Sequence, residues 1–71
     1  GLIMTIEEFF HACENARLLT TFRIFSYVTI IYNGLYEKMP QDIKNLHVQS
    51  FYIKKGIITI DTRECRRWFP E

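Results

Sequence analysis

The feature that most constrains the fold is a change in the spacing of apolar residues at Thr20. Before it, apolar residues recur every three or four positions, which places side chains on one face of a helix. From Thr20 to Tyr32 they alternate with other residues, as in a β-strand, and most are β-branched or aromatic. The sequence therefore predicts a helix over residues 4–17 and a long strand over residues 20–32.

The start of the predicted helix carries two local signals. Thr5 followed three residues later by Glu8 is a capping box, in which each residue bonds to the backbone of the other. Met4 and Phe9 stand at the two positions of a hydrophobic staple around that cap. Both signals predict that the helix begins directly after Thr5.

Two hairpins are expected to follow. Asn33-Gly34 is a preferred type I′ turn, and it would pair Tyr32 with Leu35 in a strand that ends at Pro40. Residues 41–45 read as a polar connection. A second hairpin over residues 46–61 would turn at Lys55-Gly56. A two-residue loop there places Phe51, Ile53, Ile58 and Ile60 on one face, whereas a three-residue loop scatters them, so the shorter loop fits the burial pattern better.

The last segment predicts a short helix. Asp61 and Glu64 form a plausible capping pair, and Pro70 ends the pattern. One face would carry Cys65, Trp68 and Phe69, and another would carry Arg63, Arg66 and Arg67. The fold class expected for residues 1–71 is one small α+β domain, with an N-terminal helix, an antiparallel four-stranded sheet of two hairpins and a short C-terminal helix.

Composition narrows the function classes. Of the 71 residues, 48% are hydrophobic and 15% aromatic, so some apolar surface should stay exposed after folding and mark a contact. The net charge of +1 creates no field for nucleic acid or membranes. Two cysteines suit reduced thiols in a cytoplasmic protein. Residues 18–32 are too short to span a bilayer, and no signal peptide is visible.

No arrangement of residues predicts catalysis, a cofactor or a metal. Glycine-rich phosphate loops, nucleophile elbows and Cys-x-x-Cys pairs do not occur in the sequence. His11 and Cys13 would point about 200° apart on a helix, which does not suit two ligands of one ion. Both cysteines sit in apolar stripes, where a buried thiol is usually inert. We expect neither an enzyme nor a small-molecule substrate.

Two surfaces are candidates for binding. One sheet face would carry aromatic rings beside cations, an arrangement suited to single-stranded nucleic acid, or else it forms a second packed layer. Its rings are Phe25, Tyr27, Tyr36 and Tyr52, and its cations are Arg23, Lys38 and Lys54. The other surface is the arginine cluster Arg63, Arg66 and Arg67 beside Trp68, which could clamp acidic groups or lie solvated.

The expected function is a small non-catalytic protein-interaction module, such as a regulator, an inhibitor or a complex subunit. Its expected partner is a protein, a second copy of the chain in a two-fold dimer. The alternative is a single-stranded nucleic-acid binder that uses the aromatic and basic sheet face.

Overall fold

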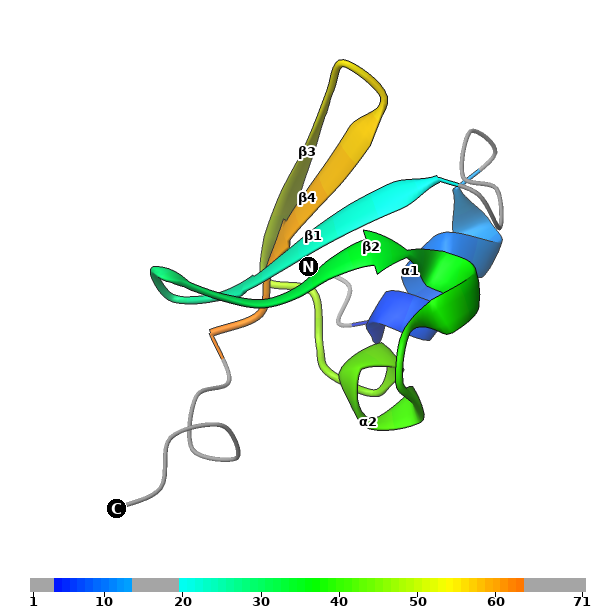
Figure 1. Ribbon diagram of the computed structural model, residues 1–71. Helices are drawn as coiled ribbons and strands as arrows, with labels where there is room; N and C mark the ends of the chain where they lie inside the picture. Colours follow the sequence, from blue (N-terminus) through cyan, green and yellow to red (C-terminus); the bar gives the residue numbers. More distant parts are fainter. Residues whose placement is uncertain (1–3, 14–19, 64–71) are drawn as a thin grey trace.

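Helical segments cover one face of a four-stranded sheet (Figure 1). The computed structural model describes residues 4–13 and 20–63, and the expected α+β class is confirmed. The elements in order are α1 (Ile6–Ala12), β1 (Thr21–Ser26), β2 (Thr29–Leu35), the 3-10 helix η1 (Tyr36–Lys38), α2 (Gln41–Lys44), β3 (Ser50–Lys54) and β4 (Ile57–Asp61). The C-terminal helix expected after Asp61 lies outside the described residues.

Helix α1 begins as the capping signals predicted. The Thr5 N–H donates to Oε1 of Glu8 at 2.8 Å, and the Glu8 N–H donates to Oγ1 of Thr5 at 3.1 Å. The helix ends at Ala12, because the backbone of Cys13 is extended (φ −88°, ψ 112°). The helix was expected to extend to residue 17; α1 ends at Ala12, and residues 14–17 lie outside the described residues.

The sheet is mixed, with strand order β2-β1-β4-β3, and not purely antiparallel as expected. Each hairpin is antiparallel, but β1 and β4 pair in parallel, with Phe22 beside Ile58 and Ile24 beside Ile60. These four residues are all buried, so the two most buried strands occupy the centre of the sheet. The long connection over residues 36–49 allows the second hairpin to dock in that direction.

The first hairpin turns at Tyr27 and Val28, and the expected turn at Asn33-Gly34 was wrong. Gly34 lies inside β2, opposite Phe22. A Cβ atom at Gly34 would lie 3.0 Å from the hydroxyl of Tyr32, and this hydroxyl donates to the Leu35 carbonyl at 2.6 Å. The absence of a side chain at Gly34 thus leaves space for the Tyr32 ring to pack across the strand, and the glycine does not form a turn.

The second hairpin has the predicted two-residue loop. Lys55 (φ 54°) and Gly56 (φ 77°) both occupy the left-handed region that a type I′ turn requires. Ile53 pairs with Ile58 and Phe51 pairs with Ile60, as the shorter loop predicted. The register is therefore confirmed.

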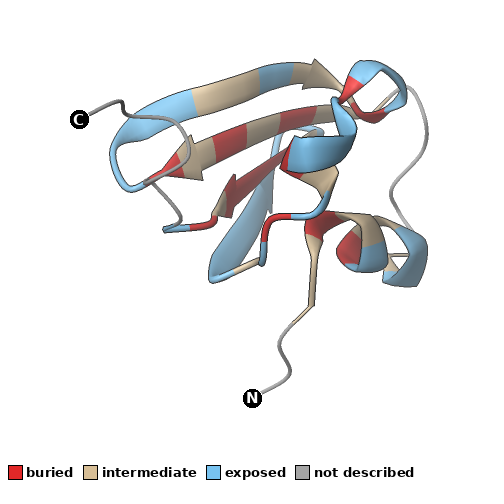
Figure 2. Ribbon diagram, turned by 90° about the horizontal axis from the view of Figure 1, so that it is seen from below, coloured by how far each residue is buried: buried red, intermediate tan, exposed pale blue. Residues whose placement is uncertain are grey.

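The core lies between the helices and the inner face of the sheet, where buried residues alternate along β1 (Figure 2). Its residues are Ile6, Phe9, Phe22, Ile24, Tyr36, Met39, Ile43, Leu46, Ile58 and Ile60. Tyr36 had been expected on a binding face. Instead η1 turns it inward, where its ring stacks on Phe10 with centroids 3.7 Å apart.

Burial raises the pKa of the Tyr36 hydroxyl, and the negative charge of Glu7 raises it further. Lys44 places its ammonium group 4.5 Å from the centre of the same ring. One aromatic side chain on η1 thus contacts residues of both α1 and α2.

Candidate functional site

The surface that stands out lies along β3, an edge strand that is exposed at all of its positions (Figure 2). Phe51, Tyr52 and Ile53 are three consecutive large side chains with exposed fractions of 52%, 57% and 47%. Folded proteins usually protect an edge strand with charges, prolines or a covering loop. Lys54 is the charged residue that β3 itself contains, so within residues 4–13 and 20–63 most of the strand lacks that protection.

On the helix side of the sheet, β3 forms one wall of an apolar groove. The groove measures about 300 Å³ and is lined by Met4, Phe9, Ala12, Cys13 and Phe51. The rings of Phe9 and Phe51 meet edge to face with centroids 4.6 Å apart. The Phe51 ring is therefore held at the mouth of the groove by α1, while half of its surface remains accessible.

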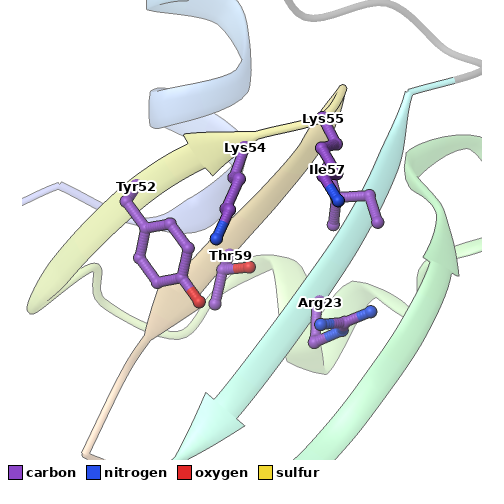
Figure 3. Close-up of a pocket in the computed structure, with 6 residues that line it drawn as sticks. All are labelled: Arg23, Tyr52, Lys54, Lys55, Ile57 and Thr59. Atoms are coloured by element: carbon purple, nitrogen blue, oxygen red, sulfur yellow. The ribbon is translucent and has the colours of Figure 1, made fainter.

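The other face of the sheet carries a shallow cationic pocket of about 240 Å³ (Figure 3). Its lining residues are Arg23, Tyr52, Lys54, Lys55, Ile57 and Thr59. Arg23 pairs with Thr59, and Thr59 pairs with Tyr52, so these three side chains form one row across β1, β4 and β3. Three of the lining residues are cations and none is acidic. Such a lining suits an anionic or planar group.

Arg23, which lines the pocket, has a hydrogen-bond donor that the described part of the chain leaves unsatisfied. Its Nε atom is buried and has no hydrogen-bond partner among the described residues. Buried donors in folded proteins nearly always have a partner. The Arg23 side chain therefore lines the pocket with its hydrogen-bonding capacity only partly used within the described residues.

The structure brings together four of the seven residues of the predicted aromatic and basic face. Phe25 alternates with the buried residues of β1 in step with Arg23, so both lie on the face that also carries Tyr52 and Lys54. Tyr27 lies in the β1–β2 turn, 55% exposed. Tyr36 belongs to the core, as described above, and Lys38 is exposed on η1.

Arg63 is the residue of the predicted arginine cluster that lies within the described residues. The Nε of Arg63 lies 3.2 Å from Oδ2 of Asp61, in a pair whose arginine side chain is 59% exposed. Exposed pairs of this kind contribute little to stability. Arg66, Arg67 and Trp68 lie outside the described residues.

Sequence reasoning missed two parts of the site. Phe51 and Ile53 were expected in the core with Ile58 and Ile60, but they lie on an edge strand and are only half covered. Lys55 was interpreted as a turn residue, and it also lines the cationic pocket. No sequence signal distinguishes an edge strand from a central one here, because β3 and β4 are both rich in apolar residues.

Three further observations concern metal ligands, membrane-spanning helices and cysteine. Within residues 4–13 and 20–63, no group of three or more His, Cys, Asp or Glu side chains could hold a metal ion. In the same residues, no helix has both the length and the apolar character needed to cross a bilayer. Cys13 is a free thiol, partly buried beside the apolar groove.

In comparisons with known proteins, no family model, no curated protein and no solved structure matches the chain.

Proposed function

We propose that this chain is a non-catalytic protein-interaction module, which binds an extended segment of a partner protein along the edge of β3. A single observation carries the proposal: β3 is an edge strand, and it presents Phe51, Tyr52 and Ile53 about half exposed. A partner strand added to such an edge gains main-chain hydrogen bonds, while alternate side chains provide specificity. Successive side chains of a partner strand bound at β3 would lie alternately beside the apolar groove on one face of the sheet and beside the cationic pocket on the other.

The test is a selection of extended peptides from a displayed random library. The chain is immobilised at low density, so that its copies cannot occupy each other's edges. We expect binders that lose affinity for Ile53→Lys, because the charge would face an apolar partner strand. Val28→Lys is the matched control, since Val28 is 91% exposed in the β1–β2 turn. If no selected peptide depends on β3, the proposal is wrong.

A cytoplasmic location is part of this proposal. The free thiol of Cys13 supports it, because a reducing compartment keeps such a group unpaired. A regulator, an inhibitor and a complex subunit are all modules of this class, and the sequence motif of the selected peptides would discriminate between them.

A second candidate function is binding of single-stranded nucleic acid, and the cationic pocket favours it. Arg23, Lys54 and Lys55 could neutralise phosphates, while a base stacks on Tyr52. Fluorescence anisotropy with a labelled oligonucleotide at several salt concentrations tests this function. Lys54→Gln with Lys55→Gln should reduce the slope of log affinity against log salt by about one per lost contact. Lys38→Gln, on exposed η1, is the control and should leave the slope unchanged.

A further inference from the structure

The direction of the backbone groups of β3 follows from its turn. Lys54 and Ile57 flank the two-residue loop at Lys55-Gly56, so they form a hydrogen-bonded pair. Hydrogen-bonded and non-hydrogen-bonded pairs alternate along an antiparallel ladder. Residues 50, 52 and 54 therefore bond to β4. The N–H and C=O groups of Phe51 and Ile53 point to the outer edge.

We infer that the segment that binds at this edge is β3 of a second copy, antiparallel to the first about a two-fold axis at Tyr52. This inference rests on the proposed function and names the partner. In this register Phe51 lies opposite Ile53 of the second copy, and the axis repeats the pair. The outward N–H and C=O groups of both residues then find partners in two hydrogen-bonded pairs, and the sheet continues across the axis.

The side chains agree with the same register. Phe51 and Ile53 lie on the helix side, so their cross-axis pair would extend the apolar lining of the groove. Tyr52 meets its own copy on the opposite face, where aromatic pairs stabilise a sheet. Lys54 lies opposite Ser50, a small neutral residue. Every apolar residue thus faces an apolar residue, and no like charges are opposed.

Two neighbouring registers lack these properties. An axis at Ile53 places Phe51 opposite Lys55, which puts a cation against an apolar ring at the mouth of the groove. An axis at Lys54 places two lysines directly opposite each other, and like charges in that position are destabilising. The charges of Lys54 and Lys55 therefore disfavour both of these registers relative to the axis at Tyr52.

The expected association is weak. Two five-residue strands bury less than the roughly 1,200 Å² of lasting complexes, so we expect a weak, transient dimer over the micromolar to millimolar range of protein concentration. Sedimentation equilibrium across that range should show the mean mass rising from 8.6 kDa toward twice that value. Ile53→Lys should weaken the dimer at least about tenfold, and Val28→Lys should not change it.

The register itself is tested by cross-linking. In a non-hydrogen-bonded antiparallel pair the Cα atoms lie about 4.5 Å apart, within the range that a disulfide spans. Tyr52→Cys should therefore form a disulfide between copies under mild oxidation, and peptide mass mapping should place the link at position 52. Val28→Cys is the control, because it is more exposed but lies at the β1–β2 turn. Hydrogen exchange on the wild-type chain should show protection of the Phe51 and Ile53 amides that grows with concentration.

The outcomes separate this inference from the proposed function. A monomer at all concentrations, in a chain whose β3 edge still binds selected peptides, overturns the second copy as the partner and leaves the proposed function standing. A dimer without protection of Phe51 and Ile53 also overturns it, because the contact then lies elsewhere. A dimer with a position-52 link and those two protected amides supports it. Far-ultraviolet circular dichroism of each variant establishes that it is folded before association is measured.

Discussion

Substitution of Gly34 by alanine tests whether this residue is part of a strand or of a turn. In the strand, the added Cβ would lie 3.0 Å from the Tyr32 hydroxyl and 3.3 Å from Cζ of the same ring. The ring can yield only by disturbing the 2.6 Å bond from its hydroxyl to the Leu35 carbonyl. If residues 33 and 34 formed a type I′ turn, the cost would instead come from the left-handed backbone and would not involve Tyr32.

The magnitudes follow from these contacts. Replacing glycine by alanine in a strand normally stabilises by about 0.5–1 kcal/mol, because the unfolded chain loses freedom. Loss of the Tyr32 hydrogen bond costs about 1 kcal/mol. Gly34→Ala should therefore be close to neutral in the native chain. In a Tyr32→Phe background, where the hydroxyl and its bond are already absent, the same change should be more favourable by about 1 kcal/mol.

Urea unfolding of the four members of this double-mutant cycle measures the coupling. For a chain of this size, the free energy of unfolding falls by about 1 kcal/mol per M urea. A coupling of about 1 kcal/mol between the two substitutions therefore corresponds to a difference of about 1 M in the urea midpoint. Additivity within about 0.3 kcal/mol, the value for independent sites, would refute the packing of Tyr32 over Gly34. A cost above about 1 kcal/mol for Gly34→Ala in both backgrounds would indicate a left-handed residue and a turn.

Three other perturbations have defined outcomes. Thr5→Ala should destabilise the fold by about 1 kcal/mol in a denaturant titration, because the capping box loses its side-chain acceptor, and an unchanged midpoint would contradict that role. Gly56→Val should cost more than about 1–2 kcal/mol, since φ is 77° and a β-branched residue is strained there. The pKa of Tyr36 is raised on folding, so its neutral form contributes stability that is present below about pH 10 and is lost as pH rises through the higher folded value. Thermal melts between pH 8 and 11 should therefore show a smaller alkaline loss for Tyr36→Phe than for the native chain, and equal losses would mean that Tyr36 ionises freely.

The parts of the fold that the sequence predicted correctly depend on neighbours along the chain. The capping box needs only Thr5 and Glu8, three residues apart. The second hairpin needs a turn tolerant of positive φ at Lys55-Gly56, with apolar residues matched on its two sides. In both cases the physical cause and the sequence signal lie within one short segment.

The first hairpin was misplaced because distant packing overrides a local preference. Asn33-Gly34 is a strong turn signal, but a turn there would keep Tyr36 and Met39 in a strand. In the structure β2 continues through Gly34 to Leu35, and η1 then places both side chains in the core. Burial of two large apolar groups is a stronger effect than the turn preference of one dipeptide.

The same distinction holds for the candidate site: features set by neighbours within one strand could be predicted, and features set by strand order could not. Alternation along β1 and β3 suffices to place Arg23, Tyr52 and Lys54 on a common face, as predicted, once their strands share a sheet. The edge position of β3 depends on strand order, and strand order depends on the parallel pairing of β1 with β4. No residue pattern within β3 encodes that pairing, so the exposure of Phe51 and Ile53 could not be predicted.

The parallel pairing of β1 with β4 also predicts an order of events during folding. Each hairpin joins neighbouring segments, so both can form early, whereas β1 finds β4 only after the chain between them has been organised. On the ribosome, the inner edge of β1, with Phe22 and Ile24, stays unpaired until Asp61 has left the exit tunnel. That interval is when the nascent chain is most open to pairing with the wrong strand. A nascent chain halted before β4 should therefore aggregate more readily than one released after it.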